Sequence, residues 1–165
     1  MGVLSWRRTD ILAYRSYLST SLVMNLIMDL SFDYLRAMLN RMDHFMDLKA
    51  AQVAMDLVEE VYRLCRKLPK DEVFGLSSQL KRSSSGIVAN IAEGFGRYTF
   101  CDKAHHFTIA RGECSEVLAH LLIAVRVQLL SPQEIHRALA LEDQTGRLLS
   151  GLILSSRKRA ISHAH

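Results

Sequence analysis

Apolar residues recur three and four positions apart along most of the chain, which is the spacing of an amphipathic α-helix. The first clear stretch runs from residue 47 to 68 and stops before Pro69, a residue that ends helices. Charged side chains fill its other faces, with acids mostly ahead of bases, as the helix dipole favours. We predict a helix here whose core seam is Leu48, Ala51, Met55, Val58, Tyr62 and Cys65.

A second helical stretch follows from residue 71 to 97. Gly94 and Gly96 weaken its end, and one of them is expected to act as the C-terminal cap. Its predicted core seam is Val73, Leu76, Leu80, Ser84, Ile87, Ile91 and Phe95.

Two more helices are marked by their start signals. Thr99 and Asp102 have the spacing of a capping box, and the stretch Ser131, Pro132 and Glu134 combines a capping box with proline at the first helical position. The core face predicted for the third helix is Phe107, Ala110, Cys114, Val117, Leu121 and Ala124 or Val125. The fourth has Ile135, Leu139, Leu149, Leu152 and Ile153 on its apolar side.

Four helices of about 22–28 residues joined by short loops predict an all-α fold, an antiparallel up-down-up-down four-helix bundle. We assign residues 43–165 to this bundle, including a basic C-terminal tail. Residues 1–42 form an N-terminal extension, which is either a loosely attached helix or upstream sequence that packs poorly and is disordered.

Composition agrees with a soluble globular protein. The 165 residues are 49% hydrophobic, and the net charge of +4 with a pI near 9.1 permits a nucleic-acid partner without requiring one. Asn25, Asp29 and Asp33 interrupt the longest apolar run, so we expect neither a membrane span nor a signal peptide, and a cytoplasmic location. The three cysteines have no CxxC spacing, as expected of reduced thiols.

The second helix has two organised faces. With 100° per residue, Gly86, Asn90, Glu93 and Arg97 all fall within roughly 80° of Arg82, opposite the core seam. Glycine inside a helix costs about 1 kcal/mol relative to alanine, with no gain on an open surface. Small residues beside an amide and a carboxylate therefore predict a close, polar contact with a neighbouring subunit.

The stretch LSSQLKRSSSGIVANIAEGFGR, followed by FTIARGECSEVLAHL, resembles the four-helix-bundle proteins encoded in intervening sequences of bacterial 23S rRNA genes. The family pattern has Gln-Leu-Arg-Arg, then Ser-Ile-Pro-Ala-Asn-Ile-Ala-Glu-Gly, then Ala-x-Gly-Ser-x-x-Glu. Residues 46–155 carry the resemblance, with a dense match from Ala89 to Gly94. The chain departs from the pattern at Lys81, Gly86, Val88 and Glu113, which stand in place of arginine, serine, proline and serine.

The resemblance implies a ring-shaped homopentamer without enzymatic activity. It also implies a relation to the accessory proteins of diversity-generating retroelements, which bind nucleic acid and a reverse transcriptase through basic surfaces. The residues predicted to form the signature and the subunit interface are Arg82, Gly86, Asn90, Glu93, Gly94, Arg97, Gly112 and Glu116.

Enzyme motifs are missing from the sequence. No HExxH motif, Glu-x-x-His pair, Gly-x-Ser-x-Gly elbow or phosphate-binding loop is present, and adjacent His105 and His106 project in different directions from a helix. We therefore expect no catalytic residue, metal or cofactor.

Basic clusters favour a nucleic-acid-associated accessory protein that binds RNA or DNA without sequence preference. Repetition of a modest charge around an oligomer strengthens phosphate binding. The predicted contact residues are Arg63, Arg66, Lys67, Lys70, Lys81, Arg157, Lys158 and Arg159. The alternative is a protein–protein adaptor, such as a reverse-transcriptase partner that does not itself bind nucleic acid.

Overall fold

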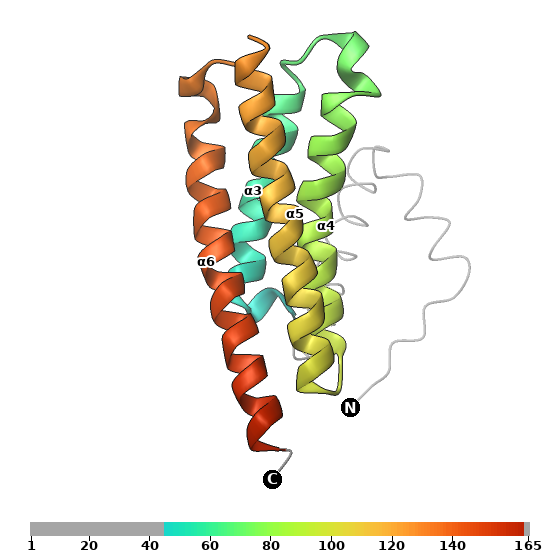
Figure 1. Ribbon diagram of the computed structural model, residues 1–165. Helices are drawn as coiled ribbons and strands as arrows, with labels where there is room; N and C mark the ends of the chain where they lie inside the picture. Colours follow the sequence, from blue (N-terminus) through green and yellow to red (C-terminus); the bar gives the residue numbers. More distant parts are fainter. Residues whose placement is uncertain (1–44, 164–165) are drawn as a thin grey trace, which may run out of the picture. The chain divides into compact units, whose positions relative to one another are not determined.

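The computed structural model describes residues 45–163, and helices are the only regular secondary structure in that range (Figure 1). A short 3₁₀ helix, η1 (Phe45–Asp47), leads into α3 (Lys49–Cys65). A second 3₁₀ helix, η2 (Lys70–Val73), precedes α4 (Leu76–Gly96), and the chain continues through α5 (Phe100–Arg126) and α6 (Pro132–Ser162). The expectations for residues 1–42 lie outside the described residues.

The helices form the predicted four-helix bundle. Each helix packs on the next one in the chain, and α6 closes the ring by packing on α3, as the ribbon in Figure 1 shows. Neighbouring helices are joined by short connections and run in opposite directions, so the up-down-up-down topology is confirmed.

The sequence signals for α5 and α6 are also confirmed. The Thr99 hydroxyl accepts from the backbone N–H of Asp102 at the start of α5, and Ser131 with Glu134 completes a full capping box at the start of α6. Every residue of the predicted core face of the third helix is buried. Of the two alternatives at its end, Ala124 is buried and Val125 is only half-buried.

The predicted seam of the first helix is wrong by a rotation about its axis. Met55 is 45% exposed and Tyr62 is 42% exposed, whereas Leu57, Val61 and Leu64 are fully buried. Apolar residues occupy two adjacent faces of this helix, so two registers satisfy the same spacing. The bundle buries the face that also carries three small alanines, Ala50, Ala51 and Ala54.

Several predicted boundaries need correction. The α4 helix begins at Leu76 rather than 71, because residues 70–73 form η2 and Val73 stays 52% exposed. Neither Gly94 nor Gly96 adopts the left-handed conformation of a glycine cap, and α4 ends with Arg97 in extended backbone. At 17 residues α3 is shorter than predicted, and at 31 residues α6 is longer.

The basic segment at the C-terminus is not a loose tail. Arg157, Lys158 and Arg159 belong to the last turns of α6, which continues to Ser162. Within residues 45–163, none of the helices combines the length and apolar character needed to cross a bilayer.

Candidate nucleic-acid and subunit interfaces

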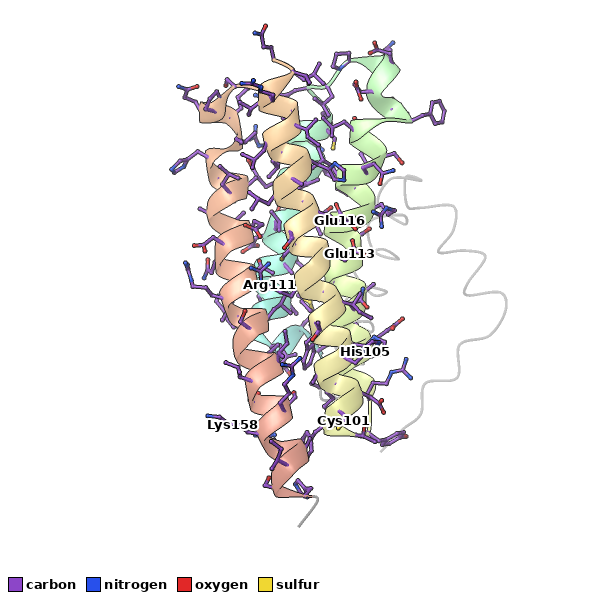
Figure 2. The ribbon with its side chains drawn as sticks, in the orientation of Figure 1. Cys101, His105, Arg111, Glu113, Glu116 and Lys158 are labelled. Carbon is purple, nitrogen blue, oxygen red and sulfur yellow. The ribbon has the colours of Figure 1, made fainter. Side chains whose placement is uncertain are left out.

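The N-terminal half of the α4 polar face, which carries Arg82 and Gly86, lies against α5 of the same chain (Figure 2 labels Glu113 and Glu116 of α5). Arg82 donates from Nη2 to Glu116 at 2.5 Å, and its Nη1 lies 3.8 Å from the carboxylate of Glu113. Burial, together with nearby Glu116, raises the pKa of Glu113. A Cβ at Gly86 would lie 2.9 Å from Cδ of Glu113, so the missing side chain makes room for this carboxyl group.

The C-terminal part of the same face, which carries Glu93 and Arg97, contacts His106 of α5, whose side chain is 13% exposed. Arg97 donates from Nε to Nε2 of His106 at 3.0 Å, and Nδ1 of the ring lies 3.0 Å from the carboxylate of Glu93. The contact between Nδ1 and the Glu93 carboxylate is close but does not have the geometry of a hydrogen bond. One imidazole of α5 thus links an acid and a base of α4.

Two further signature residues pack within the chain, and one does not. A Cβ at Gly94 would lie 2.7 Å from Cε1 of Phe107, and Asn90 donates to the carbonyl of Gly86 at 2.9 Å within α4. A Cβ at Gly112 would meet no atom of the described residues within 4 Å. The small residues of α4 therefore have a close partner in α5, and subunit contact through this face stays a prediction.

Five of the predicted nucleic-acid-binding residues lie toward the end of the bundle where α3 connects to α4: Arg63, Arg66, Lys67, Lys70 and Lys81. Three of them are engaged with other side chains. Arg63 donates twice to buried Glu60, Lys67 donates to Glu134 at 2.7 Å, and the Lys81 ammonium lies 5.4 Å from the centre of the Tyr62 ring. The Lys67 bond and two bonds from Ser131 lower the pKa of Glu134 to about 2. Only part of this group is therefore available to phosphates.

The other three predicted residues lie at the opposite end of the bundle, about 36 Å along α6 from Glu134 at 1.5 Å per residue. Arg157, Lys158 and Arg159 are all exposed, and Figure 2 shows Lys158 near the C-terminal end of α6. The Arg159 guanidinium lies 5.7 Å from the centre of the Phe100 ring. The eight predicted residues are thus divided between two separate surfaces.

The comparisons with known proteins agree with this architecture. The sequence profile of a family described as 23S rRNA-intervening sequence protein matches residues 46–151, about two thirds of the chain. The chain belongs to this family. It is also similar to the crystal structure of a protein of unknown function of the S23 ribosomal protein family from Bacteroides thetaiotaomicron, with a TM-score of 0.59 and 21% identity. The match covers 63% of this chain and 94% of that one, and it supports the fold. No curated protein matches the chain.

Family membership gives meaning to two departures from the pattern quoted above. Gly86 and Glu113 both stand where the pattern has serine, and the structure places them in direct opposition. A side chain at 86 would meet the Glu113 carboxyl group below van der Waals distance. Gly86 on α4 thus leaves room for the carboxyl group of Glu113 on α5.

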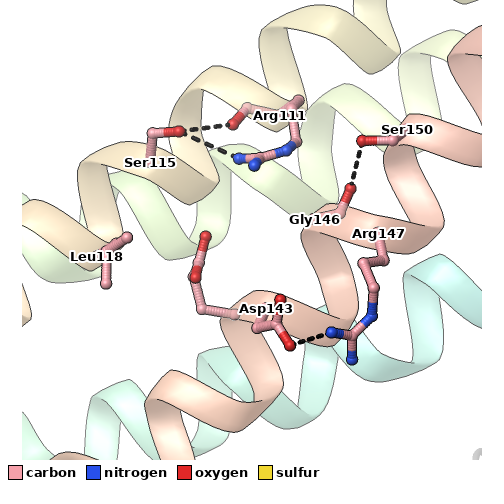
Figure 3. A pocket seen from close by; sticks show the side chains of 8 residues that line it. Arg111, Ser115, Leu118, Asp143, Gly146, Arg147 and Ser150 are labelled. Carbon is pink, nitrogen blue, oxygen red and sulfur yellow. Dashed lines mark hydrogen bonds and ion pairs between the residues drawn. The ribbon is translucent and has the colours of Figure 1, made fainter.

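A cavity of about 380 Å³ between α5 and α6 was not predicted (Figure 3). Arg111 donates to the Ser115 hydroxyl at its edge, and Asp143 pairs with Arg147 along α6. Glu142, only 6% exposed, also lines it, and burial raises its pKa despite the opposing charge of Arg111. The sequence carried one indication that Glu142 is buried, because this residue falls on the same stripe of α6 as the buried apolar residues.

Two other features bear on chemistry. Burial raises the pKa of the Cys114 thiol to about 12 and raises that of Cys65, so both thiols stay protonated and unreactive at neutral pH. Over the residues that the structure describes, no three His, Cys, Asp or Glu side chains are grouped to hold a metal ion.

Proposed function

We propose that this family member is a non-enzymatic, self-associating protein that binds RNA or DNA without sequence preference. The proposal rests on one observation, the joining of exposed basic and aromatic side chains at the end of the bundle where α4 turns into α5 and α6 ends. Exposed basic residues without aromatic neighbours would be interpreted as an ordinary solvent-exposed surface. Their combination with exposed rings favours nucleic acid.

The rings come from the connection between α4 and α5. Tyr98 is fully exposed, whereas Phe100 is half-buried and contacts both the Arg159 guanidinium and the His163 ring, whose centre is 5.2 Å from its own. A cavity of about 340 Å³ opens beside these residues. Arg157 and Lys158 extend the positive charge along the outside of α6.

This combination matches what a single strand presents. Bases stack on exposed aromatic rings irrespective of sequence, while arginine and lysine neutralise the phosphates between them. A single bundle offers few such contacts, so self-association would multiply them. The resemblance to ring-forming relatives favours five subunits.

The test is anisotropy of a labelled 20-nucleotide single-stranded RNA at increasing salt concentration. We expect the triple change of Arg157, Lys158 and Arg159 to alanine to weaken binding at least tenfold. The lost phosphate contacts should also reduce the slope of log K against log salt by about 1–2. Tyr98→Ala should weaken binding with little change in that slope, because stacking releases no counterions.

A matched control removes the same charge from the other end of the bundle, by changing Arg66, Lys70 and Arg126 to alanine. We expect it to weaken binding less than threefold. Equal losses in both triple variants would show that binding follows net charge and not this surface. Absence of any salt-sensitive binding by the parent protein at low ionic strength would refute the proposal.

A protein partner is the second candidate, and one observation favours it. Phe74 is 94% exposed and neighbouring Val73 is 52% exposed, at the end of the bundle away from the Arg157–Arg159 surface. Exposed apolar groups of this kind mark protein contacts. If the protein acts as an adaptor, Phe74→Ser should abolish capture of its partner while RNA binding is unchanged.

A further inference from the structure

The outward face of α6 carries exposed apolar residues that nothing in the described part of the chain covers. Leu154 is 59% exposed and Ile161 is 66% exposed. Together with Ala140 and Arg147 they follow the spacing 7, 7 and 7, so they lie on one stripe of the helix. A stripe of this period is typical of a helix that pairs with another helix.

Two small residues lie at the middle of the same stripe, Ser150 and Gly151. Gly146 one turn earlier has a reason within the chain, because a Cβ there would lie 3.2 Å from the guanidinium carbon of Arg111. Gly151 has none, since a Cβ there would meet no atom of the described residues within 4 Å. An interior helical glycine costs about 1 kcal/mol relative to alanine, and no contact with the described residues offsets this cost at Gly151.

This face of α6 carries a negative charge toward one end and a positive charge toward the other. Asp143 lies seven residues before Ser150, and Lys158 lies seven residues after Gly151. The cavity in Figure 3 opens beside Asp143, and buried Glu142 is among the residues that line it. Asp143 pairs with Arg147 of its own helix, and its exposed carboxylate leaves room for a second cation from outside the bundle.

We propose that a second copy of this chain docks here, α6 against α6 in antiparallel orientation, with the two-fold axis between Ser150 and Gly151. In that register Asp143 faces the partner subunit's Lys158, and Ala140 faces the partner subunit's Ile161. Arg147 lies along the partner subunit's Leu154, and the backbones approach most closely at the glycine. The ammonium of the partner's Lys158 reaches the edge of the cavity that Glu142 lines.

The antiparallel orientation follows from the charges. A parallel pairing in register would set Arg147 against its own copy and Lys158 against its own copy, and like charges in contact repel. The antiparallel pairing replaces these repulsions with two equivalent ion pairs. Such a contact is isologous, so it joins two chains and then closes.

This inference rests on the self-association in the proposed function, and it names one surface responsible for it. A ring of five requires a separate head-to-tail contact, for which the α4 face predicted from the sequence remains available. Within an α6 pair Lys158 is engaged, which leaves Arg157 and Arg159 for phosphates.

The experiment uses the full chain with exposed Cys101 changed to serine and a single new cysteine introduced by Ser150→Cys. Under mild oxidation we expect covalent dimers to form at least tenfold faster than from the control Glu59→Cys, another exposed position, on α3. Adding Asp143→Lys should slow cross-linking on the order of tenfold, and adding Lys158→Asp as well should restore the rate.

A second change separates association from folding. Gly151→Leu should leave the melting temperature unchanged or raise it, because the site is open and leucine favours helix, yet it should block cross-linking. Cross-linking no faster than that of Glu59→Cys, or no rescue by the charge exchange, would overturn the inference. If the parent protein still self-associates in light scattering, the proposed function survives that outcome. A solitary particle at all concentrations would refute both.

Discussion

Gly94 is the position where the packing of α4 on α5 can be tested most directly. A Cβ built on this glycine would lie 2.7 Å from Cε1 and 2.9 Å from Cδ1 of Phe107. Ordinary contacts begin near 3.4 Å, so the ring would have to move by more than half an ångström. Phe107 is only 4% exposed and belongs to the core, which leaves the ring little room to move.

The magnitude follows from two opposed effects. Replacing glycine by alanine inside a helix stabilises it by about 1 kcal/mol, whereas overpacking a close-packed core costs about 1–3 kcal/mol. We expect Gly94→Ala to be neutral or to destabilise the protein by up to about 2 kcal/mol. Gly112→Ala in α5 provides the control, since its Cβ would meet no described atom, and it should stabilise by about 0.5–1 kcal/mol.

The assay is urea denaturation of the full chain, comparing midpoints at constant slope. We expect the two variants to differ by about 0.5–3 kcal/mol, with Gly112→Ala the more stable. Equal stabilisation by both changes would show that the Phe107 ring does not occupy the space beside Gly94. The close approach of α4 and α5 would then be refuted at this point.

Four further variants test other parts of the structure. Ser131→Ala removes the capping box of α6 and should cost about 1 kcal/mol in thermal unfolding. Gln128→Gly should stabilise the protein by about 1 kcal/mol, because Gln128 has the left-handed φ of 62° that glycine adopts without strain. Burial raises the pKa of Glu142, so the free energy of unfolding falls as the pH rises from the pKa of this group in the unfolded chain to its raised pKa in the folded protein. Glu142→Gln should therefore stabilise the protein at pH 7 and have little effect at low pH, where the carboxyl group is protonated in both states, as measured by calorimetry. Asn90→Ala with Glu93→Ala should lower the particle mass in light scattering if α4 forms a subunit contact; an unchanged mass with lower stability would confine their role to the contact with α5.

The bundle could be predicted from the sequence because each α-helix carries a strong periodic signal and two of them carry complete start signals. The seam of α3 could not, since two adjacent faces are apolar and only packing selects between them. Exposed Met55 and Tyr62 show that hydrophobicity alone does not decide which face turns inward. Glu60 departs from the rule that charged side chains lie at the surface. It is only 2% exposed, and Arg63 donates two hydrogen bonds to its carboxylate.

The candidate site was predictable only in part. The spacing of Arg82, Gly86 and Glu93 on one face of α4 predicts a polar contact with a neighbouring subunit. In the structure these positions contact α5 of the same chain, and the subunit contact stays a prediction. Spacing within one helix cannot tell whether the partner is another helix of the chain or another subunit, because both present the same kind of surface. The neighbouring Glu113 and His106 are 27 and 13 residues away from Gly86 and Glu93 in sequence, a separation that no local pattern reports.

The interior glycines of the bundle now divide into two classes that local sequence does not distinguish. At Gly86, Gly94 and Gly146 an added Cβ would meet a carboxyl group, a phenyl ring or a guanidinium of the same chain. At Gly112 and Gly151 it would meet nothing among the described residues. Because glycine lowers helix stability wherever it stands, the first class is explained by packing within one bundle. Packing within the bundle does not explain the second class. Any contact that offsets the cost of Gly112 and Gly151 would therefore lie outside the bundle, on the outer faces of α5 and α6.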